Sequence, residues 1–170
     1  MDANPAMILS AHDEREIRAL VARYIEAVSR FDATALATTW ATDGQWHLGP
    51  RTVVGRAAIV ELWKQIIARY ESRLIQLMVD AQVQAAPGGA TGRFTFLEIA
   101  RKAGEGKDHV EVGRYSDAFA RENGQWVFAE RRFTLLYRGW IGAGEFFPVP
   151  AAEQQAAGDG IHSLLAQVLL

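Results

Sequence analysis

Chemistry in this chain has to come from side chains other than cysteine, because its 170 residues contain none. Without cysteine there are no disulfides, no thiolate catalysis and no cysteine-based zinc or iron–sulfur sites. The four histidines lie far apart in the sequence and lack metal-ligand spacing. Gly142-Ala143-Gly144 follows no parallel strand–helix context, so it is not a phosphate-binding loop. Acids, arginines and tyrosines remain as the candidates for chemistry.

Aromatic side chains are abundant, with five Trp, eight Phe and four Tyr. They pack cores, and they also line pockets for apolar ligands. The net charge of −2 favours neither nucleic acid nor an anionic membrane as a partner. Residues 1–10 lack the pattern of a secretory signal, and no apolar run is long enough to span a membrane. We therefore expect a cytoplasmic protein.

Helices are expected in the first half of the chain. Apolar residues recur at a 3.6-residue period between Ser10 and Arg30, with Ser10 as the N-cap. A short helix is expected over Ala33–Trp40, and a third over Ala57–Tyr70. A turn at 42–44 and two short strands, Gln45–Leu48 and Thr52–Val54, are expected between them.

Four long strands are expected next. Their ranges are 73–85, 91–102, 109–121 and 125–138, and glycine-containing turns follow each one. Short connections predict an antiparallel meander, so the fold class is α+β. The last strand is apolar on both faces, with Val127, Phe133 and Leu135 on one and Trp126, Phe128 and Leu136 on the other. Such a strand is covered on both sides, which predicts a homodimer through the outer sheet face.

One domain is expected over residues 1–147, followed by an extension, 148–170, that contains a candidate helix over 151–170. Several local phrases in the domain resemble the nuclear transport factor 2-like superfamily, in its SnoaL-like branch. They are RYIEAV at 23–28, WATDGQW at 40–46, GRAAI at 55–59, GRYSDAF at 113–119 and NGQW at 123–126. The resemblance covers roughly residues 12–140. It implies a cone-shaped curved sheet wrapped around three helices, with a central pocket for a small hydrophobic molecule.

The resemblance also implies chemistry, because catalytic members of this family transfer protons without metal or organic cofactor. In the steroid isomerase pattern the oxyanion-hole tyrosine falls on Tyr24 and the protonated aspartic acid on Asp117, but the general base falls on Leu48. In the dehydrochlorinase pattern the catalytic aspartate falls on Ser29 and its histidine on Gln76. The two residues that would polarise a substrate carbonyl, Tyr24 and Asp117, are therefore present, and the expected general bases are missing.

Strand parity then sorts the side chains, since alternate residues face opposite sides. With Leu48 facing inward, Trp46 also faces in and His47 points away. By the same resemblance Asp117 and Arg131 face in, and Glu98 shares a face with Phe94 and Phe96. The substrate-binding residues implied are Trp46, Leu48, Trp63, Gln76, Tyr115, Phe119 and Phe133.

Asp117 has two possible states in such a pocket. Neutral Asp117 would donate a hydrogen bond to a substrate carbonyl, assisted by Tyr24; ionised Asp117 would form a buried ion pair with Arg131. If Glu98 faces inward, it is the best replacement base. The candidate catalytic residues are therefore Tyr24, Asp117, Arg131 and Glu98, with no metal.

The leading hypothesis is a cofactor-independent isomerase, lyase or cyclase that acts on a small hydrophobic carbonyl compound. The alternative is a non-catalytic ligand-binding or scaffolding domain, since the expected base positions hold Ser29, Leu48 and Gln76. A third possibility is a subunit of a larger oxygenase, in which the outer sheet face would bind a different protein.

Overall fold

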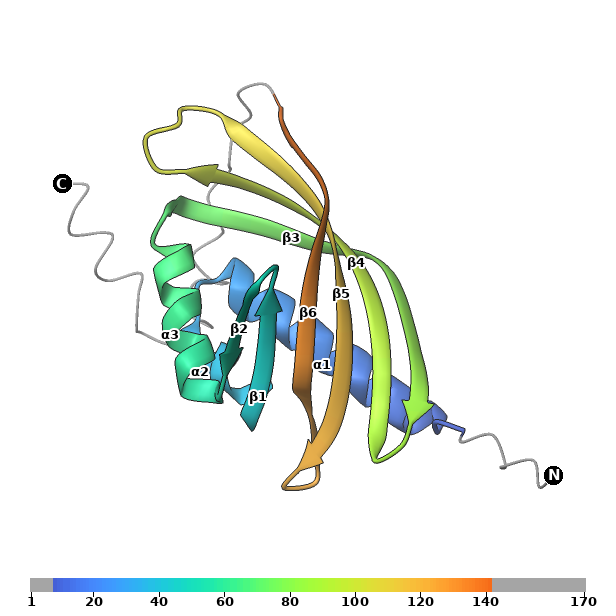
Figure 1. The fold of residues 1–170 in the computed structure, drawn as a ribbon. Coiled ribbons are helices and arrows are strands. Elements are labelled where there is room, and N and C mark those ends of the chain that lie inside the picture. The colour runs from blue at the N-terminus through green and yellow to red at the C-terminus, as the bar shows by residue number, and fades with distance from the viewer. Residues whose placement is uncertain (1–7, 142–170) are drawn as a thin grey trace, which may run out of the picture.

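The computed structural model describes residues 8–141, apart from the side chains of residues 72 and 73; the predicted extension lies outside this range. Helix α1 lies across one face of a curved sheet, which we call the inner face (Figure 1). The helices are α1 (Ala11–Ser29), α2 (Ala33–Thr38) and α3 (Arg56–Ile67). The strands are β1 (Trp40–Leu48), β2 (Arg51–Val54), β3 (Tyr70–Ala86), β4 (Gly89–Lys102), β5 (Asp108–Glu122) and β6 (Gln125–Trp140).

The six strands form one sheet in the order β2-β1-β6-β5-β4-β3. The predicted antiparallel meander of β3 to β6 is confirmed. Strand β1, however, pairs with β6 in parallel, so the sheet is mixed rather than wholly antiparallel. A parallel pair needs a long connection between its strands. Here that connection is residues 49–124, and the patterns of neighbouring elements in the sequence did not predict the pairing. The fold class, α+β, is as predicted.

Several element boundaries differ from those predicted, and at three places the type of structure differs as well. The expected turn at 42–44 lies inside β1, and Trp40 and Tyr70 begin strands instead of ending helices. The pairing of β1 with β6 shifts between Trp40 and Gln45, which is where the polar residues Thr42 and Asp43 lie exposed. Two backbone hydrogen bonds, from Phe128 N to Thr39 O and from Gly55 N to Gly44 O, both 2.8 Å, pair backbone polar groups around this irregularity. Turn-forming residues therefore occupy an irregular strand.

Strand β6 changes face part-way along its length. Its pairing with β5 shifts between Phe128 and Glu130, an irregularity that inserts one extra residue. As a result Phe128, which contacts Phe119, and Phe133, which contacts Tyr115, both lie on the inner face. The prediction that placed Phe128 and Phe133 on opposite faces is wrong, because strict alternation holds only within a regular ladder.

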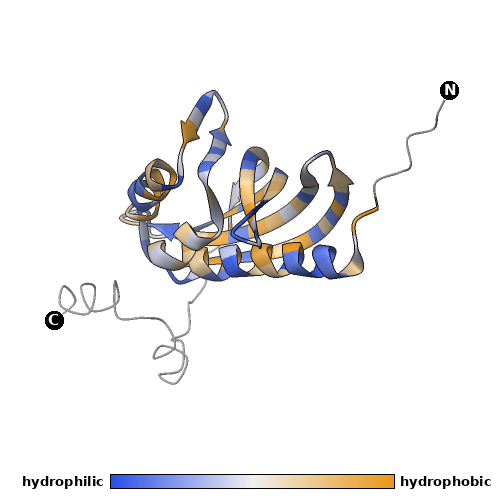
Figure 2. Cartoon of the chain, turned by 90° about the horizontal axis from the view of Figure 1, so that it is seen from below, coloured by the Kyte–Doolittle hydropathy of each residue, from blue (hydrophilic) through white to orange (hydrophobic). Residues whose placement is uncertain are grey.

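Helix α1 is amphipathic, as its sequence predicts. Its buried stripe includes Ile17, Leu20 and Tyr24, and the Ser10 hydroxyl caps it by accepting a hydrogen bond from the Asp13 N–H. In the view from below, hydrophobic and hydrophilic residues alternate along α1, with the sheet on one side of it (Figure 2). No helix in residues 8–141 is long and apolar enough to cross a membrane.

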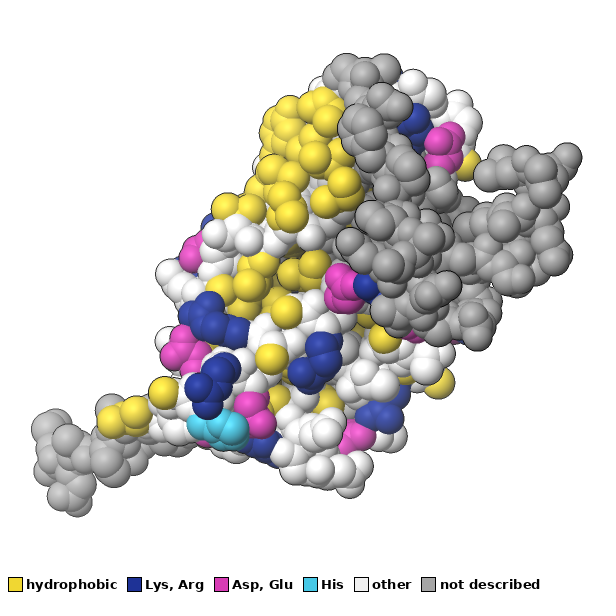
Figure 3. Space-filling model, turned by 180° about the vertical axis from the view of Figure 1, so that it is seen from behind, with side chains coloured by type: hydrophobic (Ala, Val, Ile, Leu, Met, Phe, Trp, Pro, Cys, Tyr) yellow, Lys and Arg dark blue, Asp and Glu magenta, His cyan; other side chains and the backbone are white. Residues whose placement is uncertain are grey.

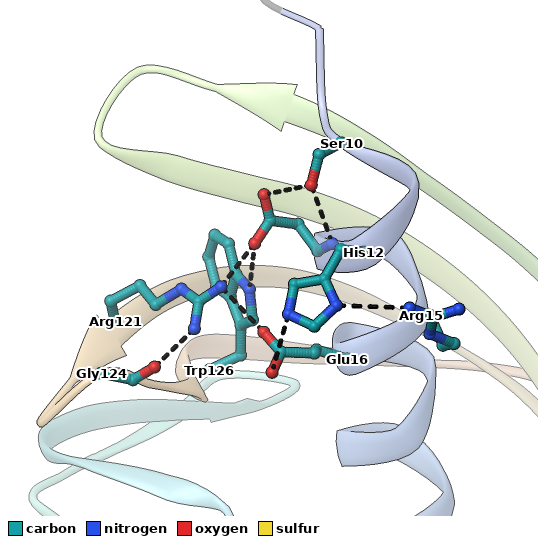
Figure 4. Close-up of polar contacts among 8 residues, drawn as sticks. Ser10, His12, Arg15, Glu16, Arg121, Gly124 and Trp126 are labelled. Atoms are coloured by element: carbon teal, nitrogen blue, oxygen red, sulfur yellow. Dashed lines mark hydrogen bonds and ion pairs between the residues drawn. The ribbon is translucent and has the colours of Figure 1, made fainter.

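The start of α1 is bound to the far end of the β5–β6 hairpin (Figure 4). The Trp126 indole N–H donates to Asp13 Oδ1 at 3.1 Å, and the Arg121 guanidinium pairs with both Asp13 and Glu16. The Arg121 guanidinium also lies 4.6 Å from the centre of the Trp126 ring. These contacts fix the helix across the inner face and so determine which side chains it covers.

Candidate functional site

The inner face of the sheet is arranged in rows of paired side chains that run from β3 to β6. Two of these rows are polar, and two rows rich in aromatic side chains separate them. The carboxylate row is Gln76, Glu98, Glu111 and Arg138, and the other polar row ends in the paired residues Asp117 and Arg131. The rows between them are Met78, Phe96, Gly113, Leu135 and Ala81, Phe94, Tyr115, Phe133.

Glycine at position 113 lets two aromatic rings meet over the sheet. A Cβ there would lie 2.5 Å from Phe96 Cζ and 2.6 Å from Phe133 Cε2, closer than real side chains approach. The rings therefore cover the backbone at Gly113, and Phe96 stacks on Tyr115 with ring centres 4.8 Å apart. This packing fills the space between the two polar rows.

Arg131 and Asp117 form a buried bidentate ion pair. Arg131 Nε donates to Asp117 Oδ1 at 2.9 Å and Nη2 donates to Oδ2 at 2.7 Å, while the two side chains are 1% and 0% exposed. Burial raises the pKa of Asp117, and the Arg131 charge opposes that rise. A guanidinium keeps its proton at any ordinary pH, and Asp117 raises the pKa of Arg131 further. Both Asp117 oxygens accept hydrogen bonds from the guanidinium, which is the arrangement of a carboxylate and not of a carboxylic acid. Of the two states considered for Asp117, the geometry supports the ion pair.

Three aromatic rings surround the Arg131 guanidinium. Its carbon lies 4.2 Å from the ring centre of Tyr24 and 3.9 Å from those of Tyr115 and Phe128. Burial raises the pKa of both tyrosine hydroxyls, so both stay protonated. One guanidinium nitrogen, Nη1, is buried without a hydrogen-bond partner among the described residues.

A small cavity opens beside this arginine. It offers about 10 Å³ to water-sized molecules, roughly the room of one water. Gln76 contributes a second unsatisfied atom to it, since Gln76 Oε1 also has no hydrogen-bond partner in the described part of the chain. Among the described residues, the cavity is thus lined by one residue with an unpaired donor, Arg131 Nη1, and by one with an unpaired acceptor, Gln76 Oε1. The lining residues are Val21, Tyr24, Ile25, Gln76, Met78, Phe94, Phe96, Tyr115 and Arg131.

Glu98 faces inward and lies next to this cavity. Gln76 Nε2 donates to Glu98 Oε2 at 3.2 Å, which links Glu98 to a residue of the cavity wall. Burial raises the pKa of Glu98 to about 7, with the neighbouring Glu111 charge as the second cause. A carboxyl group that titrates near neutral pH can both accept and release a proton.

The structure groups the predicted site residues unequally. Tyr24, Gln76, Tyr115 and Arg131 line the cavity, with Asp117 behind Arg131 and Glu98 behind Gln76. The other predicted residues lie outside its wall: Trp46 packs on Trp40, Trp63 is buried on α3, Leu48 is half-buried on β1, and Phe119 and Phe133 pack among other rings.

His47 points away from the cavity, as strand parity predicts. Its Nδ1 lies 2.8 Å from Thr52 Oγ1 and its Nε2 lies 3.0 Å from Glu130 Oε1, both on the outer face. The residues that sequence reasoning missed are Glu111 and His109. Both are buried on the inner face of β5. Continuing the alternation backward from Asp117 would have placed them there.

His109 is buried with neither ring nitrogen hydrogen-bonded to a described residue, and its Nε2 lies 3.7 Å from Glu111 Oε1. Burial lowers the pKa of His109, so its ring is neutral at neutral pH. In residues 8–141, no group of three or more histidine, aspartate or glutamate side chains is placed to hold a metal ion.

A family model for the SnoaL-like domain matches residues 10–132, which is most of the chain. The chain belongs to the SnoaL-like domain family. The matched segment of this SnoaL-like domain contains the Asp117–Arg131 pair, the cavity wall and three of the four residues of the carboxylate row. No curated protein matches the sequence significantly.

Solved structures share the fold of this SnoaL-like domain at low sequence identity. A scytalone dehydratase candidate from Novosphingobium aromaticivorans is 19% identical, with a TM-score of 0.70 over 81% of this chain and 93% of its own. A hexachlorocyclohexane dehydrochlorinase, LinA-type3, from Novosphingobium barchaimii is 18% identical, with a TM-score of 0.71 over 82% and 100%. An NTF2-like protein of unknown function from Pseudomonas putida is 18% identical, with a TM-score of 0.63 over 75% and 89%. The likeness establishes the NTF2-like cone fold predicted from the sequence.

Replacing Asp117 by Asn should destabilise the SnoaL-like domain strongly. The substitution leaves the Arg131 charge buried without its counter-ion, which costs about 3–5 kcal/mol in such pairs. The double variant Asp117→Leu with Arg131→Met removes both charges and should cost less than the single change. Urea unfolding of the three proteins measures both effects. A single variant within about 1 kcal/mol of the unmodified protein would contradict the assignment.

Replacing Glu98 by Gln should raise the free energy of unfolding, relative to the unmodified protein, more at pH 8 than at pH 5. The folded pKa of about 7 lies above the ordinary 4.5, so the folded state binds the extra proton and stability falls as pH rises from about 4.5 through 7. Glutamine removes that loss, which is worth up to about 3 kcal/mol. Urea unfolding at the two pH values measures the gain, and Glu61→Gln on the exposed surface of α3 is the control. An equal effect at both pH values would show that Glu98 does not titrate as described.

Proposed function

We propose that this protein is a cofactor-independent acid–base enzyme of the isomerase, lyase or cyclase type, acting on a small hydrophobic carbonyl compound. The observation that carries the proposal is the pair of unsatisfied atoms in one cavity: Arg131 Nη1 as donor and Gln76 Oε1 as acceptor. Buried polar atoms normally have partners, and atoms without one at a cavity point to a ligand or a water.

Each residue then has a defined role. Arg131 Nη1, with the Tyr24 hydroxyl beside it, stabilises the negative charge that develops on a carbonyl oxygen when the neighbouring carbon loses a proton. Glu98 accepts that proton and returns it at another carbon or to a leaving group, while Gln76 orients Glu98 and the substrate. Asp117 acts as a positioning residue, because both of its oxygens already accept hydrogen bonds from Arg131.

Substrate entry requires the cavity to widen, since about 10 Å³ holds no metabolite. Met78 and Ile25 line the cavity and are partly exposed. Methionine is unbranched and adapts easily to new packing, so we place the entrance at Met78. Two structural neighbours are named as a dehydratase candidate and a dehydrochlorinase, names that agree with a lyase reaction.

Proton abstraction is testable before the substrate is known. A panel of small apolar ketones is incubated with the protein in D₂O, and exchange of the proton next to the carbonyl is followed by NMR. Glu98→Gln should reduce exchange about 100-fold or more, because general-base catalysis typically contributes that much, while Glu61→Gln should leave it unchanged. Exchange that is equal in both variants would overturn the role of Glu98.

The small volume of the cavity favours a second candidate, a non-catalytic ligand-binding or scaffolding domain. Native mass spectrometry of freshly purified protein separates the two candidates. A bound apolar molecule that is released unchanged, together with no exchange on the whole panel, would support the binding domain.

We also propose that the protein is a homodimer through the outer sheet face, in the cytoplasm as expected from the sequence. The exposed large hydrophobic side chains concentrate in residues 75–79 and 135–141, and Ile75, Leu77 and Tyr137 among them face outward. Others, such as Met78 and Trp140, face inward, and the view from behind, on the α1 side, shows hydrophobic side chains gathered over the upper end of the sheet (Figure 3). On the outer face, Leu77, Leu97, Val112 and Tyr137 are paired in one row across four strands. Monomers rarely expose a large apolar patch.

Replacing the exposed Leu77 by Glu should convert the dimer to a monomer, because a charge would be buried without a partner at the interface. Light scattering after size-exclusion chromatography measures the mass. Ala57→Glu adds the same charge on α3 and should leave the dimer intact. A monomeric unmodified protein would refute the dimer.

A further inference from the structure

The carboxylate row places two acidic side chains directly beside each other. Glu98 on β4 and Glu111 on β5 are cross-strand partners, so their Cβ atoms are about 5 Å apart. Both side chains are buried. Two neighbouring carboxylates in a buried site do not ionise together easily, because the second charge must form beside the first.

The partners of the two carboxylates decide which one holds the charge. Arg138 Nε donates to Glu111 Oε1 at 2.7 Å, which provides a counter-ion. Glu98 receives a hydrogen bond at 3.2 Å from the neutral amide of Gln76. A charge-assisted hydrogen bond favours the ionised carboxylate more than a neutral donor does. The negative charge therefore belongs on Glu111 and the proton on Glu98.

We propose that Glu111, paired with Arg138, is a positioning residue whose charge acts on Glu98, its cross-strand neighbour, and favours the protonated form of Glu98. The consequence for catalysis rests on the proposed function, in which Glu98 moves the proton. Glu111 is not among the residues that line the cavity, and it acts through its charge from the strand next to Glu98.

Other groups around Glu98 do not supply this negative charge. Lys102 and Arg138 are cationic and lower the pKa of Glu98. Burial raises the pKa of Tyr70 and Tyr115, so both hydroxyls are neutral near pH 7. His109, beside Glu111, is neutral as well. Glu111 is the anion that faces Glu98 within the described residues.

Titration of Glu98 by carbon NMR tests the proposal without a substrate. The full chain is labelled with ¹³C-glutamate, and the Glu98 carboxyl signal is assigned as the one missing from Glu98→Gln. In Glu111→Gln the midpoint should fall below about 7, because the neighbouring charge is gone, and stay above 4.5, because burial still raises it. In Arg138→Gln it should rise, because a cation that favours the ionised form is gone. Arg132→Gln, which removes an exposed arginine from the same strand, is the control and should not move it.

Opposite shifts in the two variants support the proposal, since a general loosening of the fold would move both midpoints in the same direction. A midpoint that stays in place in Glu111→Gln overturns it. The pH dependence of deuterium exchange should shift with the NMR midpoint in each variant. If exchange does not depend on Glu98 at all, the proposed function fails, and the titration still decides the role of Glu111.

Discussion

A guanidinium cannot be left without an anion inside a protein, and the burial of Arg131 is the constraint on which the rest of this structure depends. The arginine is 1% exposed and is enclosed by three rings contributed by α1, β5 and β6. Asp117 supplies the counter-ion from the adjacent strand, in register. The ion pair therefore fixes the spacing of β5 and β6 and the side chains that α1 can bring against them.

The ion pair also determines what the cavity can offer a ligand. Because Nε and Nη2 are occupied by Asp117, the remaining nitrogen, Nη1, is held at a fixed position. A donor held in place by neighbouring groups needs no reorganisation when charge develops beside it. The aromatic rows keep this donor apart from the carboxylate row, so that a strong acid–base pair does not form between Arg131 and Glu98. The two polar groups stay distinct and meet only through Gln76, which belongs to the cavity wall.

Much of the fold follows from local sequence patterns. The apolar stripe of α1, the glycine-containing turns and the alternation along the strands each indicate the element that the structure shows. The parallel β1–β6 pairing depends on contacts distant in sequence, and no local pattern encodes it. Local patterns also failed to predict the bulge in β6, where one inserted residue reversed the face on which Phe128 lies. For the site, the family resemblance placed Arg131 inward, and parity put Glu98 on one face with Phe94 and Phe96 but left open which face that was. Neither could show that the rings of Phe96 and Tyr115 fill the interior, because the volume left over depends on how rotamers pack.

The attachment of α1 to the β5–β6 hairpin has a consequence for biosynthesis. Asp13 contacts Arg121 and Trp126, which lie 108 and 113 residues later in the chain, and Tyr24 packs against Phe128, so these partners of the first helix are translated long after it. While the ribosome makes the intervening strands, the apolar stripe of α1 has no sheet to cover it. Nascent chains in this state expose hydrophobic surface and are substrates for chaperones. Part of the apolar stripe of α1 therefore stays exposed until the β5–β6 hairpin emerges from the ribosome.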